Sequence, residues 1–148
     1  MKKMITKALI LSCLFLTSIF IRANDTIPHG KWEVSQVTIE KNIDGKHSRE
    51  VYKDAKVQNH IPCPQTWEIR DVKTIKLKFS DETEVTTEYV LKEDTMTIIY
   101  HGAIMKYQCI VTDNDLTLTI TKKYQWNTPS GHVEQIEEKW VINLIKKE

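Results

Sequence analysis

The side chains best suited to chemistry in this chain are its histidines and cysteines. The five histidines are spread along the chain: His29, His47, His60, His101 and His132. No pair of them has the spacing of a metal-binding motif, and a loop histidine without such a pattern is usually a solvated side chain. We therefore expect no metal and no cofactor.

Nucleophilic catalysis needs a nucleophile, a base within hydrogen-bond reach and a third group that orients the base. Cys63 and Cys109 could meet His60 or His101 in this way, but the sequence has no Gly-rich phosphate loop and no nucleophile elbow. We expect no catalytic residue and predict that the protein is not an enzyme. The two cysteines are instead expected to form a disulfide, worth about 4 kcal/mol. Two separate buried thiols are the alternative.

The beginning of the chain has the three-part layout of a secretory signal. Three lysines among the first seven residues precede an apolar run over residues 8–21, and the small residue Ala23 follows at the expected cleavage point. The run is shorter than the roughly 20 residues that span a bilayer. We predict a signal peptide over 1–23, an exported domain over 24–148 and no membrane span, with a retained membrane anchor as the alternative.

A lipid anchor is a second alternative, because Leu11-Ser12-Cys13 is similar to part of a bacterial lipobox, whose cysteine is lipidated. Against it, the chain stays apolar after Cys13, where lipoprotein signals turn polar. Cleavage near Ala23 would remove four basic residues and no acidic one, leaving 17 basic against 20 acidic side chains, a net charge of −3. This balance argues against a nucleic-acid partner, which requires a basic surface.

From residue 30 onward the sequence predicts strands joined by short turns. Thr, Val, Ile and Tyr recur, and no window shows a helical period of apolar residues. Leu116, Leu118 and Ile120 alternate with three threonines in the clearest example. Residues 53–64 form a long connector with room for a short helical turn. The expected strands cover residues 31–41, 46–52, 65–70, 74–79, 84–91, 95–100, 104–112, 116–121 and 133–145.

Short connections imply that consecutive strands pair in an antiparallel meander. A meander of this length has two open edges, which attract other chains, and closure into an up-and-down barrel removes them. About eight strands suffice to enclose one small ligand. We therefore predict an all-β, antiparallel up-and-down barrel, with an open curved sheet or a sandwich as the alternative.

Several segments resemble bacterial lipocalin-like domains exported by Bacteroidetes. Gly30-Lys31-Trp32 resembles the G-x-W signature of lipocalins, and the segments 63–69, 91–98 and 113–118 are similar to later strands of that family. The resemblance covers most of residues 30–146. It implies an eight-stranded calycin-type barrel with an internal cavity, in the periplasm or at the outer surface of a Gram-negative bacterium.

The resemblance also assigns structural roles. Trp32 would close one end of the barrel, and lipocalins place an arginine across that tryptophan. The last strand here offers Lys139, Lys146 and Lys147 but no arginine. Gly30, Trp32 and Trp140 are expected to be structural.

Apolar and aromatic side chains would line the barrel interior or mouth, as they line most small-molecule sites. Plain core packing is the alternative for each of them. Trp126 differs, because it lies beside the turn at 127–131, where an exposed aromatic ring could touch a ligand or a partner. The candidate ligand-binding residues are Trp67, Ile69, Leu77, Phe79, Tyr89, Tyr100, Tyr107, Leu118 and Trp126.

Together these features predict an exported lipocalin-like binding protein that holds a small apolar or amphipathic molecule in its barrel. The alternative is a protein-interaction module, either an inhibitor or an accessory subunit, that uses loops at the barrel end and takes no small molecule.

Overall fold

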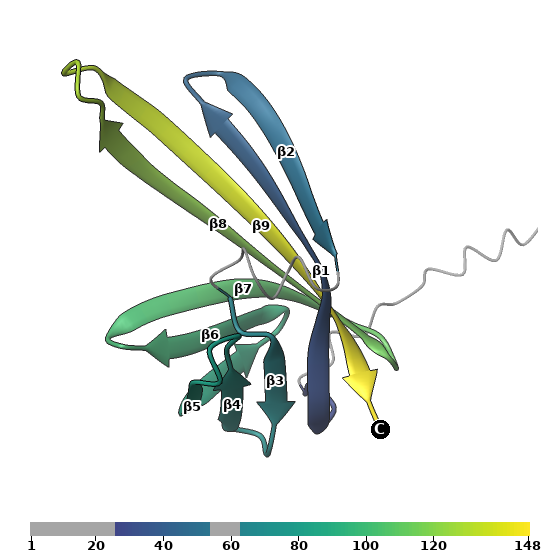
Figure 1. The fold of residues 1–148 in the computed structure, drawn as a ribbon. Coiled ribbons are helices and arrows are strands. Elements are labelled where there is room, and N and C mark those ends of the chain that lie inside the picture. Colours follow the sequence, from purple (N-terminus) through teal and green to yellow (C-terminus); the bar gives the residue numbers. More distant parts are fainter. Residues whose placement is uncertain (1–25, 54–62) are drawn as a thin grey trace, which may run out of the picture.

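The computed structural model describes residues 26–53 and 63–148, and all regular structure in these ranges is β-strand. The predicted signal peptide, Cys13, His60 and most of the connector lie outside the described residues. The strands, labelled in Figure 1, are β1 (Gly30–Ile43), β2 (Lys46–Lys53), β3 (Thr66–Ile69), β4 (Thr74–Lys78), β5 (Glu84–Lys92), β6 (Thr95–Tyr100), β7 (Ala103–Val111), β8 (Asp115–Asn127) and β9 (Val133–Lys147).

Eight of the nine strands close into an antiparallel barrel. Each strand from β3 to β8 pairs with the next along the chain, and β1 closes the ring by pairing with both β3 and β9. Trp32 on β1 lies opposite Trp67 in one ladder and opposite Lys146 in the other. The predicted up-and-down barrel is therefore confirmed, and the open sheet and the sandwich are excluded.

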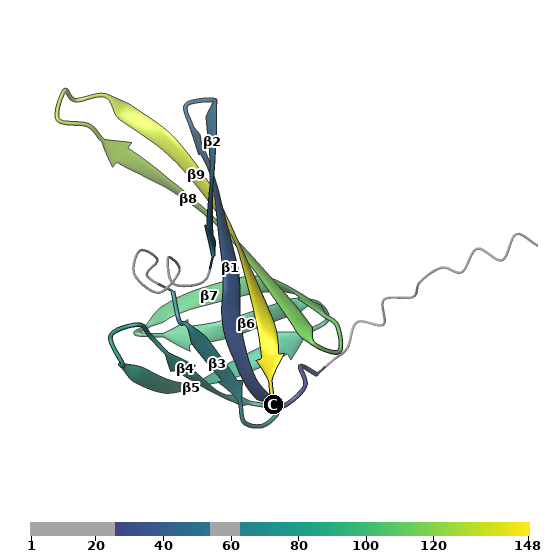
Figure 2. The ribbon, with the colours of Figure 1, turned by 45° about the vertical axis from the view of Figure 1, so that its right-hand side comes forward.

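The strands β1, β8 and β9 are longer than the barrel wall, and their far halves leave it as a separate sheet (Figures 1 and 2). β2 pairs with this half of β1, so the strand order is β2-β1-β9-β8. We call this four-stranded sheet the extension. It consists of residues 36–43, 46–53, 119–127 and 133–141. The sequence predicted a barrel of about eight strands without this extension, and the strand expected at 116–121 ended well before Asn127.

A β-bulge marks the point where β1 changes partners. β1 pairs with β3 as far as Glu33 and with β2 from Gln36, and its register with β9 shifts between Val34 and Gln36. The extra residue is Ser35, whose hydroxyl donates to the backbone carbonyl of Asn143 at 3.1 Å. A bulge bends its strand and increases the local twist. The bulge therefore accompanies the departure of β1 from the barrel.

Large apolar side chains fill the barrel around two tryptophans. The rings of Trp67 and Tyr107 meet edge to face, with centroids 5.5 Å apart. The indole N–H of Trp32 donates to the carbonyl of Pro28, and that of Trp67 donates to the carbonyl of Pro64, both at 3.1 Å. The other fully buried barrel residues are Ile69, Ile75, Leu77, Met96, Ile98, Leu116, Leu118, Ile142 and Leu144.

A lysine lies across Trp32. The ammonium of Lys146 is 6.0 Å from the centroid of the Trp32 ring, within the range of a cation–π contact. Gly30 has a positive φ of 130°, and a Cβ atom there would stand 3.3 Å from the Lys146 side chain. Glycine fits both the backbone conformation and the close approach. Gly30, Trp32 and Lys146 therefore form one cluster where β1 begins.

Cys63 and Cys109 are both buried and both free, so the expected disulfide is not formed. The Cys109 thiol donates to the carbonyl of Tyr107 at 3.7 Å, whereas the Cys63 sulfur lies 4.0 Å from the side-chain nitrogen of Gln65. Burial raises the pKa of each thiol to about 12. The cysteines act as two separate apolar core residues, which was the alternative interpretation.

We expect both thiols to resist modification in the folded protein. A neutral thiol is a poor nucleophile, and a pKa of about 12 keeps both groups neutral at pH 8. In the predicted exported domain, residues 24–148, Ellman's reagent at pH 8 should therefore label two cysteines in denaturant and none in the folded barrel. Rapid labelling of the folded protein, or a mass two hydrogens below that of the reduced chain, would contradict the assignment.

We expect Trp67→Ala and Trp126→Ala to affect stability very differently. Trp67 is fully buried, so its removal should cost about 3–5 kcal/mol in free energy of unfolding. Trp126 is 57% exposed, so its removal should change stability by less than about 0.5 kcal/mol. Urea denaturation followed by circular dichroism measures both. Equal losses in the two variants would mean that Trp126 is a core residue.

Candidate functional site

Most of the predicted ligand-binding residues are packed in the barrel core. Six are buried: Trp67, Ile69, Leu77, Tyr89, Tyr107 and Leu118. A side chain beside a water-sized cavity keeps some exposed area, yet Trp67, Leu77 and Leu118 have none. No space large enough for water therefore borders these three side chains.

Two predicted lining residues are only partly buried. Phe79 follows β4 and Tyr100 ends β6, and their rings stack with centroids 5.7 Å apart. His101 adds a third ring, at 4.3 Å from Tyr100. Of the predicted lining residues, only Phe79 and Tyr100 in this cluster and Trp126 elsewhere are appreciably accessible to solvent.

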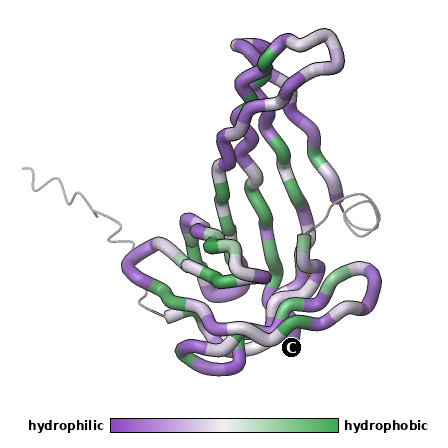
Figure 3. Tube along the Cα trace, turned by 90° about the vertical axis from the view of Figure 1, so that its left-hand side faces the viewer, coloured by the Kyte–Doolittle hydropathy of each residue, from purple (hydrophilic) through white to green (hydrophobic). Residues whose placement is uncertain are grey.

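Trp126 lies near the end of β8, in the extension and not in a loop. Side chains alternate between the two faces of a strand, and the register puts Trp126 on the face that Leu118 and Ile142 occupy inside the barrel. Figure 3 shows apolar segments continuing from the barrel into the extension. We call this surface of the extension the aromatic face. Its members on β1, β8 and β9 are Ile39, Lys41, Ile43, Ile120, Lys122, Tyr124, Trp126, Glu134, Ile136, Glu138 and Trp140.

The carboxylate of Glu138 lies at the centre of the aromatic face and fixes two of its rings, those of Tyr124 and Trp140. One oxygen accepts a hydrogen bond from the Tyr124 hydroxyl at 2.8 Å and an ion pair from the Lys41 ammonium at 3.1 Å. The other oxygen accepts from the indole N–H of Trp140 at 3.1 Å. The Lys122 ammonium lies over that indole, 5.3 Å from the ring centroid. Two aromatic rings of an open sheet are thus held in set orientations.

The protonation of this cluster follows from its contacts. Burial alone raises the pKa of Glu138, but the hydrogen bonds from Tyr124, Trp140 and Lys41 outweigh it and lower the pKa below the ordinary 4.5. The hydrogen bond to Glu138 raises the pKa of Tyr124 above 10.0. At neutral pH the carboxylate is therefore charged and the phenol is neutral, as the hydrogen bond requires.

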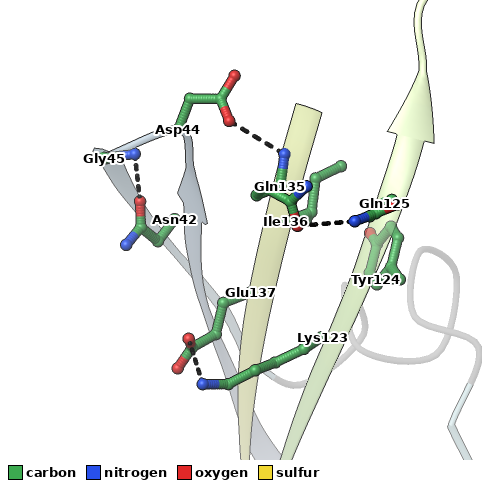
Figure 4. A pocket seen from close by; sticks show the side chains of 9 residues that line it. All are labelled: Asn42, Asp44, Gly45, Lys123, Tyr124, Gln125, Gln135, Ile136 and Glu137. Carbon is green, nitrogen blue, oxygen red and sulfur yellow. Dashed lines mark hydrogen bonds and ion pairs between the residues drawn. The ribbon is translucent and has the colours of Figure 1, made fainter. Parts of the chain in front are cut away.

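The opposite face of the extension, which we call the polar face, carries paired charges. Lys123 pairs with Glu137 at 3.0 Å, and Glu40 lies between Arg49 at 3.9 Å and Lys139 at 3.6 Å. Hollows of about 370 and 440 Å³ open along this face, the first near the tip (Figure 4). Because most of the charges around the hollows already have partners, this face offers less for recognition than the aromatic face.

The tip of the extension is tied across two hairpins by Asp44 (Figure 4). Its carboxylate accepts from the backbone N–H of Gln135 at 3.0 Å and contacts the His132 ring at 3.1 Å. The backbone N–H of Asp44 donates in turn to the carbonyl of Gln135 at 3.2 Å. The bonds from Gln135 and His132 lower the pKa of Asp44. The turn between β1 and β2 is therefore fixed to β9.

Comparison with known proteins does not assign a family. No protein-family model, curated sequence or solved structure matches the chain. The resemblance to bacterial lipocalin-like domains therefore stays a prediction. Within the described ranges, no three histidine, cysteine or acidic side chains stand close enough to hold a metal ion. The same ranges contain no helix of the length and apolarity needed to cross a bilayer.

Sequence reasoning missed the residues that organise the aromatic face. Tyr124 and Glu138 were not singled out, and Trp140 was expected to be structural only. A signal was present, because Tyr124 and Trp126 continue the alternation of Leu116, Leu118 and Ile120 along the same strand. That signal would have extended the strand to residue 127. It does not show that the strands on the opposite side of the barrel end before this residue is reached.

Replacing Glu138 should change the ionisation of Tyr124. In Glu138→Gln the negative charge beside the phenol is lost, so the pKa of Tyr124 should fall towards 10.0. Spectrophotometric titration at 295 nm, with Tyr124→Phe used to identify the signal, measures the shift. Tyr52, whose pKa is raised by Glu50, serves as the internal control and should not move.

The stability of the same variant, Glu138→Gln, at acidic pH gives a second test of the cluster. The folded-state pKa of Glu138 is lowered, so its contribution to stability is present above about pH 4.5 and is lost as the pH falls through the lowered value. The stability difference between the wild type and Glu138→Gln should shrink over that range. An unchanged Tyr124 titration together with a pH-independent difference would contradict the hydrogen-bonded cluster.

Proposed function

We propose that this protein is a non-catalytic interaction module that binds a protein partner through the aromatic face of its extension. The observation that carries the proposal is a contrast in burial. Trp67 and Leu118 in the barrel have no exposed area, whereas Tyr124 and Trp126 are 41% and 57% exposed on a sheet with no facing layer among the described residues.

Exposed aromatic side chains of this kind favour a protein interface. Tyr and Trp are enriched at the centres of interfaces, where one ring can supply a large share of the binding energy. Covering the exposed part of Trp126 alone would contribute on the order of 2 kcal/mol. A patch of neighbouring exposed aromatic and apolar residues is typical of such a surface.

The contacts of Glu138 support a recognition role for these rings. A partner that meets flexible side chains must pay about 0.5–1.5 kcal/mol for each one that it immobilises. Hydrogen bonds from Tyr124 and Trp140 to Glu138 already restrict both rings in the free protein. The aromatic face is therefore preorganised for contact. Export by the predicted signal peptide, with a partner outside the cytoplasm, forms part of the proposal.

A small apolar or amphipathic ligand remains the second candidate. Its support is the partly buried stack of Phe79 and Tyr100, whose rings could contact such a molecule at the edge of the core. The fully buried side chains around Trp67 speak against a ligand deep in the barrel. This is why we place the partner on the extension.

Site-specific photo-crosslinking in the native host tests the proposal. A photoreactive amino acid at position 126 should give a discrete crosslinked species with one protein. The same amino acid at position 104 should not, although Ile104 on the barrel wall is 65% exposed and equally apolar. Equal crosslinking at both positions would contradict the proposal. Recovery of the chain by native mass spectrometry with a bound small molecule and no protein partner would also contradict it.

A further inference from the structure

The extension has two open strand edges among the described residues. β8 pairs with β7 only over 116–119, so residues 121–127 have β9 on one side and no described strand on the other. β2 pairs with β1 alone. An open edge presents unpaired backbone N–H and C=O groups, which is how many domains bind extended peptides.

The hydrogen bonds at the tip show which backbone groups of β8 face outward. Both backbone groups of Gln135 bond to Asp44, so they point away from β8. Gln125 lies opposite Gln135, and this pair is therefore not joined by ladder hydrogen bonds. The backbone N–H and C=O of Gln125 thus point to the open edge. Because these groups alternate in direction along a strand, those of Thr121 and Lys123 point to the same edge.

The side chains of β8 differ between its two faces. Tyr124 and Trp126 stand on the aromatic face directly at the open edge, whereas Lys123 stands on the polar face with 73% of its side chain exposed. A strand added beside β8 would place alternate side chains against the two rings and the others beside Lys123. β2 offers only Tyr52 as an aromatic residue on that face.

Charge at the edges disfavours a second copy of the chain as the added strand. Residues 121–127 contain Lys122 and Lys123 and no acidic residue. β2 carries Lys46, Arg49 and Lys53 against the single carboxylate of Glu50. Pairing between any two of these edges would bring like charges together, and edge lysines are a common protection against self-association. An acidic segment is complementary to both lysines of β8. On the polar face, its carboxylate would share the Lys123 ammonium with Glu137, which lies 3.0 Å from that ammonium.

We propose that the partner supplies an acidic, extended polypeptide segment that adds to β8 as a fifth strand of the extension. Its backbone pairs with the outward groups of Thr121, Lys123 and Gln125. Its apolar side chains pack on Tyr124 and Trp126, and the alternate carboxylates lie beside Lys123. This inference rests on the proposed function and specifies the chemistry of the partner at the same surface.

The first test uses a short, fluorescein-labelled peptide of alternating valine and glutamate, with a valine–lysine peptide as the matched control. Anisotropy with the full chain should show binding of the acidic peptide and much weaker binding of the basic one. Amide hydrogen exchange should show that Thr121, Lys123 and Gln125 gain protection on binding. No binding of the acidic peptide, equal binding of both, or protection confined to β2 or the barrel would overturn the inference.

A pair of variants tests the backbone contact. Gln125→Pro removes an outward N–H, and proline is tolerated on an edge strand where that group faces solvent. Its binding of the acidic peptide should fall about tenfold, the loss expected for one or two hydrogen bonds. Gln125→Ala keeps the N–H and should bind like the wild type. Equal binding by both variants would overturn the inference, and hydrogen exchange in the wild type gives an answer even if the proline variant misfolds.

The fate of the crosslink at position 126 separates this inference from the proposed function. If the crosslinked species persists in Gln125→Pro, the partner uses the aromatic face without strand addition, and the inference fails while the proposed function stands. If position 126 gives no specific crosslink in the wild type, the proposed function fails as well.

Discussion

β1 and β9 form one antiparallel ladder that runs from Lys31 opposite Lys147 to Ile43 opposite Ile136. In its first half the ladder closes the barrel, because β1 also pairs with β3 there. In its second half it becomes the central pair of the extension, with β2 and β8 on either side. Without it the barrel would gain two edges and the extension would separate into two hairpins. A marginally stable domain depends strongly on such long-range pairing.

The properties of the aromatic face follow from this continuity. Along β8 and β9, one set of alternate side chains points inward in the barrel and is covered by the opposite wall. The same set continues past the rim, where no described wall faces it. Fully apolar side chains there would leave a large exposed patch. Glu138 and Lys41, which form an ion pair, interrupt the apolar surface. Hydrogen bonds to Glu138 hold the exposed ring of Tyr124 and the partly buried ring of Trp140 in fixed positions.

The sequence was sufficient to predict the barrel, because burial on one side of a strand appears directly as a period of two. The alternation of Leu116, Leu118 and Ile120 identified a wall strand correctly, and short turns gave the order of pairing. The extension could not be predicted in this way. A strand that packs on a core and a strand in the extension can show the same alternation of apolar and polar residues. The bulge at Ser35 also has no residue type that would identify it in the sequence.

The errors at individual residues have similar causes. An even number of cysteines suggested a bridge, but the count gives no information on whether the two side chains meet, and Cys63 and Cys109 have different neighbours. Trp126 was identified as exposed because it lies beside the turn at 127–131, yet its strand was ended too early. Glu138 was not predicted as a site residue, because a charged residue in a strand is usually solvated. Only the fold shows that three donors surround its carboxylate.

The inward face of the barrel continues past its rim as an ordered sheet that no other described strand covers. Nuclear Overhauser effects between backbone protons of opposing strands test this arrangement directly. We predict strong cross-strand contacts joining Ile43 to Ile136 and Gln125 to Gln135, as strong as those that join Val37 to Ile142 at the barrel rim. Random-coil chemical shifts without cross-strand contacts beyond the barrel would contradict the account.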